Sequence, residues 1–196
     1  APNVDTVLCN VALSACGRAA WRQVLQLLGE LHGYTVTPDI ISYNCAITAC
    51  GKSHHSGRVH DLLREIDDRR LEVTVVTLSA AMDAFNRIGK WQETLLLWPR
   101  FRGSLTANEF TYDAMLHAFS LARYWQRSLA LLRRMDARKI SPSLTSKSAA
   151  ISTCGSSLQW TYALTLLEDF QALRVALDTV ATTVISALGR SAKWQQ

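Results

Sequence analysis

The sequence has few cysteines, few prolines and no long apolar run, and each shortage excludes a class of protein. Its five cysteines form no CxxC pair and are odd in number, which argues against a disulfide scaffold and favours a reducing compartment. Only four prolines and nine glycines occur among 196 residues, which excludes a collagen-like or linker-rich chain. No apolar run approaches the roughly 20 residues that cross a bilayer, so we expect no membrane-spanning helix.

Catalytic and cofactor signatures are missing as well. The sequence contains no GxSxG, HExxH, P-loop or dinucleotide-binding fingerprint, and no zinc-deaminase signature. His54, His55 and His60 lie close together, but a metal site would need a fourth ligand. We therefore predict that the chain is not an enzyme and holds no metal and no cofactor.

The composition is that of a folded, mildly basic chain. Hydrophobic residues make up 48% and charged residues 19%, which is enough apolar surface to build a core. The formal net charge is +5, which permits an anionic partner such as nucleic acid without requiring one.

A repeat of 34 or 35 residues runs through the sequence. Tryptophans mark it, first two periods apart and then at intervals of 34, 35 and 34 residues: Trp21, Trp91, Trp125, Trp160 and Trp194. A small residue followed by a bulkier one recurs with the same period: Ala15-Cys16, Ala49-Cys50, Ala84-Phe85, Ala118-Phe119, Thr153-Cys154 and Ala187-Leu188. A fixed period of this length is the signature of a repeat architecture.

Each period predicts two helices, because its apolar residues recur at helical spacing on either side of a short turn. First helices should begin near Asn3, Ile40, Val75, Glu109, Leu144 and Asp178, and second helices near Trp21, Ser56, Trp91, Trp125 and Trp160. A helix pair cannot bury its apolar face alone, so neighbouring pairs must stack. The predicted fold class is therefore all-α, an α-solenoid superhelix of helix-turn-helix repeats.

We predict one domain over residues 1–196, with repeats at 1–38, 39–73, 74–107, 108–142, 143–176 and, in part, 177–196. No terminal repeat has a polar cap, so we expect a segment of a longer array. One set of apolar residues should be buried in every repeat: Leu13, Ile47, Met82, Leu116, Ile151 and Ile185. The tryptophans and the cysteines at positions 16, 50 and 154 should pack in the interior, and Pro99 should end or kink its helix.

The segment TPDIISYNCAITACGK, with LLREI behind it, closely resembles the pentatricopeptide repeat. That motif runs roughly Pro-Asp, two β-branched residues, Thr-Tyr-Asn, an apolar residue, Ala, then Lys and Gly. NEFTYDAMLHAFS followed by SLALLRRMDARKISP is similar to it too. A tetratricopeptide repeat would place its Trp early in the first helix, whereas here Trp opens the second helix.

The resemblance implies modular binding of single-stranded RNA, about one base per repeat, in mitochondria or plastids. Base edges would be read by pairs of polar side chains from adjacent repeats: Asn10 with Asp39, Asn44 with Thr74, and Ser79 with Asn108. By resemblance these pairs favour uracil, a pyrimidine and adenine, whereas Asp113 with Ser143 matches no known pairing. The bases would be gripped by the apolar residues Val7, Ile41, Val76 and Phe110.

Phosphate contact in the family falls to a basic residue that closes the first helix. That position holds Arg18, Lys52, Arg87 and Arg190, but Leu121 and Ser156 in the fourth and fifth repeats. Two functions therefore remain open. The chain is either an organelle RNA-binding module that acts in RNA processing, stability or translation, or a protein–protein scaffold subunit of a large organelle complex such as a ribosome or photosynthetic assembly.

Overall fold

The computed structural model describes residues 21–31, 38–99, 107–157 and 159–171, and these are helical with short connections. No strand occurs among them, so the predicted all-α class is confirmed. None of the helices in these ranges is long and apolar enough to cross a membrane. The chain divides into two compact units, Ala1–Thr106 and Ala107–Gln196.

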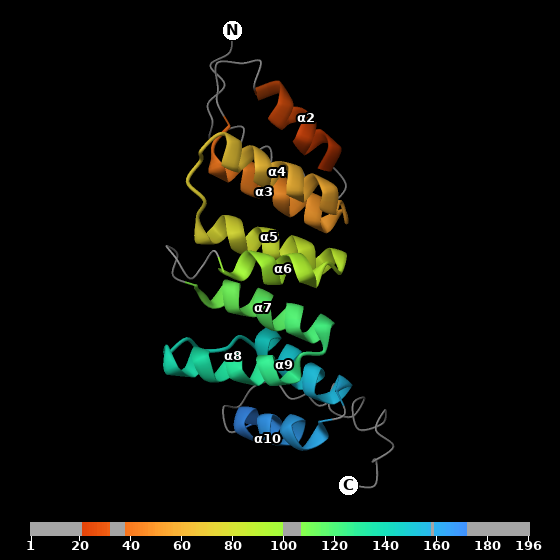
Figure 1. Ribbon diagram of the computed structural model, residues 1–196, viewed down its shortest axis with the longest axis vertical. Helices are drawn as coiled ribbons and strands as arrows, with labels where there is room; N and C mark the ends of the chain where they lie inside the picture. The colour runs from red at the N-terminus through yellow and green to blue at the C-terminus, as the bar shows by residue number, and fades with distance from the viewer. Residues whose placement is uncertain (1–20, 32–37, 100–106, 158, 172–196) are drawn as a thin grey trace. The chain divides into compact units, whose positions relative to one another are not determined.

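Unit 1 contains α2 to α6, and its helices pair as the repeat pattern predicts (Figure 1). Their bounds are α2 Trp21–Leu31, α3 Ile40–Lys52, α4 Ser56–Asp68, α5 Val75–Ile88 and α6 Trp91–Leu97. The first helix α3 packs against its own second helix α4 and against the next first helix, α5, which in turn packs against α6. First helices therefore contact one another along the unit, as in a solenoid.

Unit 2 repeats the same arrangement with α7 Glu109–Ala122, α8 Trp125–Ala137, α9 Leu144–Ser156 and α10 Trp160–Gln171. Here α7 packs against α8 and α9, and α9 packs against α10. The first residue of every helix from α2 to α10 is the residue predicted from the sequence period.

A capping side chain fixes the start of each described first helix. The N-cap residues are extended, and each accepts a hydrogen bond from the backbone N–H three residues later: Asp39, Thr74, Asn108 and Ser143. In α3 this bond joins Ser42 N to Asp39 Oδ1 at 2.9 Å, and in α7 it joins Thr111 N to Asn108 Oδ1 at 3.1 Å. A side chain of this kind satisfies one of the four N–H groups that a helix start leaves open.

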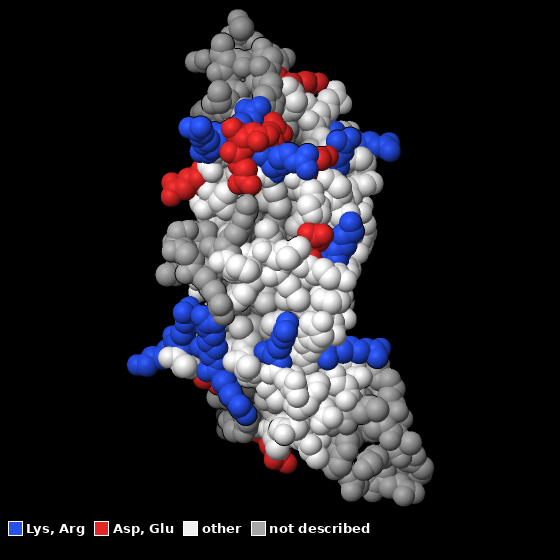
Figure 2. All heavy atoms as spheres, viewed as in Figure 1, with Lys and Arg blue, Asp and Glu red and all other residues white. Residues whose placement is uncertain are grey.

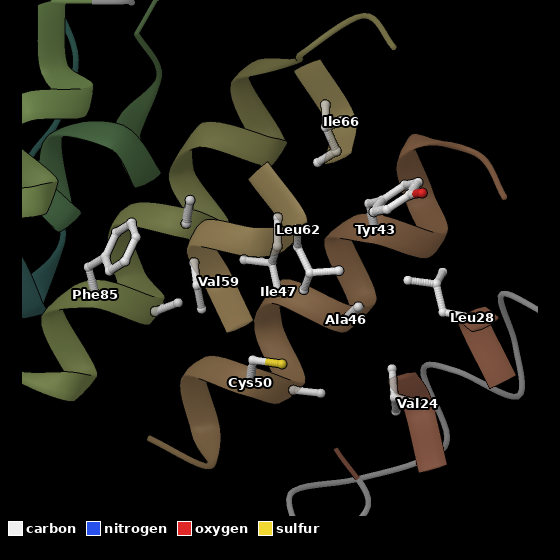
Figure 3. Packing of buried hydrophobic residues seen from close by; sticks show 13 residues of the cluster. Val24, Leu28, Tyr43, Ala46, Ile47, Cys50, Val59, Leu62, Ile66 and Phe85 are labelled. Atoms are coloured by element: carbon white, nitrogen blue, oxygen red, sulfur yellow. The ribbon is translucent and has the colours of Figure 1, made fainter. Parts of the chain in front are cut away.

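The core of each unit runs along its first helices. The eighth residue of each described first helix is completely buried, with 0% exposure: Ile47, Met82, Leu116 and Ile151. Figure 3 shows Ile47, Cys50 and Ala46 of α3 facing Leu62 and Val59 of the second helix α4. The predicted buried set is thus confirmed for these four members, while Leu13 and Ile185 lie outside the described residues.

Three smaller expectations are also confirmed. The helix α6 ends at Leu97, two residues before Pro99, whose ring cannot continue a helix. Cys50 and Cys154 are fully buried, and burial raises the pKa of each thiol to about 11. Trp21 and Trp125 are half-buried and pack against the core clusters of units 1 and 2 respectively.

The two first helices of unit 1 come unusually close at Gly51. A Cβ placed on this residue would lie 2.5 Å from the Cβ of Ala84 and 2.7 Å from its Cα. Real Cβ atoms do not approach so closely, so α3 and α5 require glycine at this point of contact.

Candidate nucleic-acid interface

Large apolar side chains are exposed to solvent at the same position of three first helices. The second helical residue is Ile41 in α3, Val76 in α5 and Phe110 in α7, and these are 53%, 61% and 71% exposed. They are the predicted base-gripping residues. Single exposed apolar residues are common on protein surfaces, but their recurrence at one register of a repeat indicates a surface that contacts a flat or apolar ligand.

Polar side chains lie two residues before these apolar residues, at the N-caps. Asp39, Thr74 and Asn108 are the predicted base readers of the repeat junctions, and the structure places all three at the N-cap, half-buried. Their oxygens already accept hydrogen bonds from their own helices. Thr111 Oγ1, for example, donates to Asn108 Oδ1 at 2.8 Å in addition to the backbone bond. Each predicted reader is therefore also the cap of its own helix.

The second set of predicted readers occupies the fifth residue of each first helix, one turn beyond the N-cap. Asn44 and Ser79 are both half-buried there. The amide oxygen of Asn44 is buried and has no hydrogen-bond partner within the described part of the chain. An unsatisfied amide costs free energy of about 1–3 kcal/mol, which a ligand donor would recover.

In unit 2 the two residues of the corresponding pair, Asp113 and Ser143, form a hydrogen bond with each other. Ser143 Oγ donates to Asp113 Oδ2 at 2.8 Å, and Ser146 Oγ donates to the other carboxylate oxygen of Asp113. Asp113 and Ser143 are the pair that matched no known base, and here each is the partner of the other. The contact also shows that the fifth residue of one first helix and the N-cap of the next lie within hydrogen-bonding distance.

The predicted phosphate-binding residues differ in their surroundings. Lys52 closes α3, is exposed, and forms no ion pair with any of the residues that the structure describes. Arg87 closes α5, but its Nε lies 2.7 Å from Asp83 Oδ2, one turn earlier on the same helix. Both side chains of this pair are about half exposed, so it contributes little stability and salt screens it.

Four predicted site residues lie outside the described residues: Asn10, Val7, Arg18 and Arg190. Near the predicted readers, α3 also carries a free thiol, that of Cys45. Burial, and to a smaller extent the Asp39 carboxylate, raises the pKa of the half-buried Cys45 thiol, so it is a poor nucleophile.

Sequence reasoning missed the capping role of the reader residues. A signal was present, because Asp, Thr, Asn and Ser are preferred N-caps and each lies directly before an apolar helical segment. Sequence reasoning also missed a row of arginines on the second helix α8, which consists of Arg127, Arg134 and Arg138.

A model of the pentatricopeptide repeat domain matches residues 102–157. This segment of the chain is similar to the pentatricopeptide repeat. The match confirms the resemblance of the second motif, since the matched region contains NEFTYDAMLHAFS. No curated protein matches the sequence.

Solved structures of pentatricopeptide repeat proteins share the fold. Maize PPR10 aligns with a TM-score of 0.64 at 20% identity over 94% of this chain and 26% of PPR10. PPR10 in complex with an 18-nt psaJ RNA element aligns with a TM-score of 0.68 at 22% identity over 100% of this chain, which spans 28% of that protein. The pentatricopeptide domain of Arabidopsis thaliana protein-only RNase P 1, solved with tRNA, gives 0.74 at 12% identity, covering 97% of this chain and 98% of that domain. Identities this low establish the shared fold.

Proposed function

We propose that this chain binds single-stranded RNA through its first helices, with about one base per repeat, and acts in RNA processing, stability or translation in a mitochondrion or plastid. The observation that carries the proposal is the recurrence of exposed Ile41, Val76 and Phe110, each two residues after a polar N-cap. Apolar faces stack on any base, and polar groups beside them bind base edges. The solved relatives support it, because PPR10 was solved with an RNA element and the RNase P domain with tRNA.

The unsatisfied amide of Asn44 fits this role. Its oxygen is buried and accepts no hydrogen bond from the residues that the structure describes, so it is available to a donor on a base. With Thr74 at the next N-cap, the pair would accept the edge of a pyrimidine, by family resemblance. The order expected for the pairs that begin at Asn10, Asn44 and Ser79 is uracil, pyrimidine and adenine from the 5′ side.

Exposed apolar residues permit a test that leaves the fold intact. Val76→Ser changes a side chain that is 61% exposed, so stability should hardly change. Binding of a fluorescent oligonucleotide with the expected base order should weaken about five- to tenfold, because an apolar contact with a base is lost. Leu96→Ser is the matched control, since Leu96 is 71% exposed but lies on the second helix α6. Equal losses from both variants, or from neither, would contradict the proposal.

Base reading needs a separate comparison. Asn44→Ala should weaken binding of the expected oligonucleotide by about 1–3 kcal/mol, by analogy with direct base contacts, and leave a scrambled one nearly unchanged. Lys52→Ala should weaken both alike and reduce the dependence of binding on salt. Anisotropy titrations at several salt concentrations measure both effects.

A scaffold role is the second candidate, and the closed pair of Asp113 and Ser143 favours it for unit 2. Side chains that satisfy each other are not available to a base edge. Leu121 also stands where α3 and α5 have a cation, and it is 42% exposed. A complete lack of salt-dependent RNA binding would support this role, in which protein subunits of a large organelle complex cover the first helices.

A further inference from the structure

The second helix α8 carries an arginine row that the proposed reading of single-stranded RNA does not use. The row consists of Arg127, Arg134 and Arg138, which are seven and four residues apart. At about 3.6 residues per turn, the three side chains leave the helix within roughly 20° of one direction. At about 1.5 Å per residue, the row is roughly 16 Å long. Arg127 and Arg138 are exposed and Arg134 is half-buried.

No acidic side chain neutralises this row within the described part of unit 2. Four ion pairs between described residues, Arg58–Asp61, His60–Glu93, Arg69–Glu65 and Arg87–Asp83, join residues of unit 1, and none of them involves the row. The only acid on α8 is Asp136, which lies about 160° around the helix from Arg134. Figure 2 shows Lys and Arg side chains gathered over α8, whereas over α4 they are mixed with Asp and Glu.

The fold does not require arginine at these positions. Because α4 and α8 begin at equivalent residues, the row corresponds in α4 to Arg58, Glu65 and Arg69. There the charges cancel: Arg69 Nη2 lies 3.0 Å from Glu65 Oε1, and Arg58 Nη1 lies 3.5 Å from Asp61 Oδ2. Where α4 has Glu65, α8 has Arg134, so the row on α8 consists of three positive charges.

Like charges on one face repel each other and lower stability unless an anion binds. Arginine suits phosphate in particular, because its planar guanidinium donates two parallel hydrogen bonds to phosphate oxygens. An aromatic group lies at the N-terminal end of the row. The guanidinium of Arg127 lies 5.0 Å from the ring of exposed Tyr124, and Trp125 lies 5.2 Å from the ring of exposed Tyr162 on α10.

We propose that the arginine row of α8 binds the phosphate backbone of double-stranded RNA without reading its sequence. A row about 16 Å long on one face of a helix can contact several phosphates of a duplex, because the duplex holds its backbone in a fixed shape. Arginines and exposed tyrosines are also typical of nucleic-acid surfaces, which favours RNA over an acidic protein. The site lies on a second helix, so it is distinct from the first-helix face that would contact single strands.

The test uses the full chain and a fluorescent RNA duplex of about 20 base pairs, a length slightly greater than a double-stranded RNA-binding domain spans. The base edges of a duplex are already paired, so the first-helix readers contribute nothing and this test is independent of the proposed function. The triple variant Arg127→Gln, Arg134→Gln, Arg138→Gln should bind the duplex at least roughly tenfold more weakly. The slope of log affinity against log salt should fall by about 2 to 3.

A matched control removes the same charge from unit 1. Arg58→Gln, Arg64→Gln, Arg70→Gln alters three exposed arginines of α4 and its C-terminal turn, and it should leave duplex affinity within about twofold of the unmodified chain. Equal losses from both triple variants would show a net-charge effect and overturn the proposal. Failure of the unmodified chain to bind the duplex would overturn it too. So would a row-dependent affinity for a polyglutamate peptide that exceeds the affinity for RNA.

Discussion

The two units share one scaffold and differ in where they carry charge. In unit 1 the cations Lys52 and Arg87 close the first helices, and the charges on the second helix α4 are paired. In unit 2 the first helix α7 has the apolar Leu121 at that position, and the second helix α8 carries the arginine row, for which the described residues provide no ion pair. The period, the N-caps and the buried positions are the same in both. A repeat scaffold therefore leaves its surface positions free to change while its core positions stay fixed.

The reader pairs differ in the same way. Asn44 keeps an unsatisfied amide in unit 1, whereas Asp113 of unit 2 accepts hydrogen bonds from Ser143 and Ser146. An unsatisfied polar group stores binding energy for a ligand, and a satisfied one does not. We infer that unit 1 is the better candidate for reading bases and unit 2 for contacts without base edges.

The largest effect should come from the shared core. Ile47→Ala in unit 1 and Ile151→Ala in unit 2 each remove a fully buried side chain, so each should lower the free energy of unfolding by about 2–5 kcal/mol. Urea unfolding followed by circular dichroism measures this loss. Val76→Ala, at an exposed position, is the control and should change stability by less than about 0.5 kcal/mol. A large loss in one unit and none in the other would break the claim of a common scaffold.

The next effect concerns the contact between α3 and α5 in unit 1. Gly51→Ala should cost about 1–3 kcal/mol, because the added methyl group would meet Ala84 of α5. The position equivalent to Gly51 is Ser120 in α7 and Gly155 in α9, so the contact of α7 with α9 has no such requirement for glycine on α7. Gly57→Ala on α4 is the control: nothing lies within 4 Å of its added Cβ, and helix propensity should make it neutral or stabilising. Thermal melts of both variants would show the contrast, and a neutral Gly51→Ala would refute the close approach.

The N-caps allow capping to be separated from base reading. Asn108→Ala should lower stability by about 1 kcal/mol, because α7 loses the side chain that accepts from Thr111 N. Asn108→Asp keeps an acceptor at the cap, so stability should be retained while the preferred base changes. Melting temperature and oligonucleotide affinity, measured on both variants, decide the matter. If Asn108→Asp leaves base preference unchanged, Asn108 is a cap alone.

Much of this fold could be predicted from the sequence, because apolar residues recur with one period and Trp opens most of the described second helices. Ile47 and its equivalents were found in this way. The surface was harder to predict. The hydrogen bond from Ser143 to Asp113 joins two side chains that are 30 residues apart in the sequence and meet where α7 packs against α9. No local sequence pattern reveals such a contact. The arginine row could have been found by comparing α8 with α4 position by position, since Arg134 occupies the position in α8 that Glu65 occupies in α4.

The smallest effect concerns the ends of α5 and α7. The residue after each helix has a left-handed backbone: Gly89 with φ of 84° in unit 1, and Arg123 with φ of 58° in unit 2. Glycine adopts this conformation without a steric penalty, whereas a residue with a Cβ is strained. Gly89→Ala should therefore lower the free energy of unfolding by about 1 kcal/mol.

Arg123→Gly should change stability in the opposite direction, by a smaller amount. The relief of strain in the folded chain is partly offset because glycine gives the unfolded chain more conformational freedom, so the net gain should be a few tenths of a kcal/mol. Arg123 also lies next to Tyr124 at the N-terminal end of the arginine row. If its charge contributes to RNA binding there, Arg123→Gly should weaken duplex binding while it stabilises the fold. Denaturant midpoints measure the change in stability, and duplex titrations on the same protein preparation measure the change in RNA affinity. A gain in stability with unchanged duplex affinity would show that Arg123 does not contact the RNA and that the contact is limited to the arginine row.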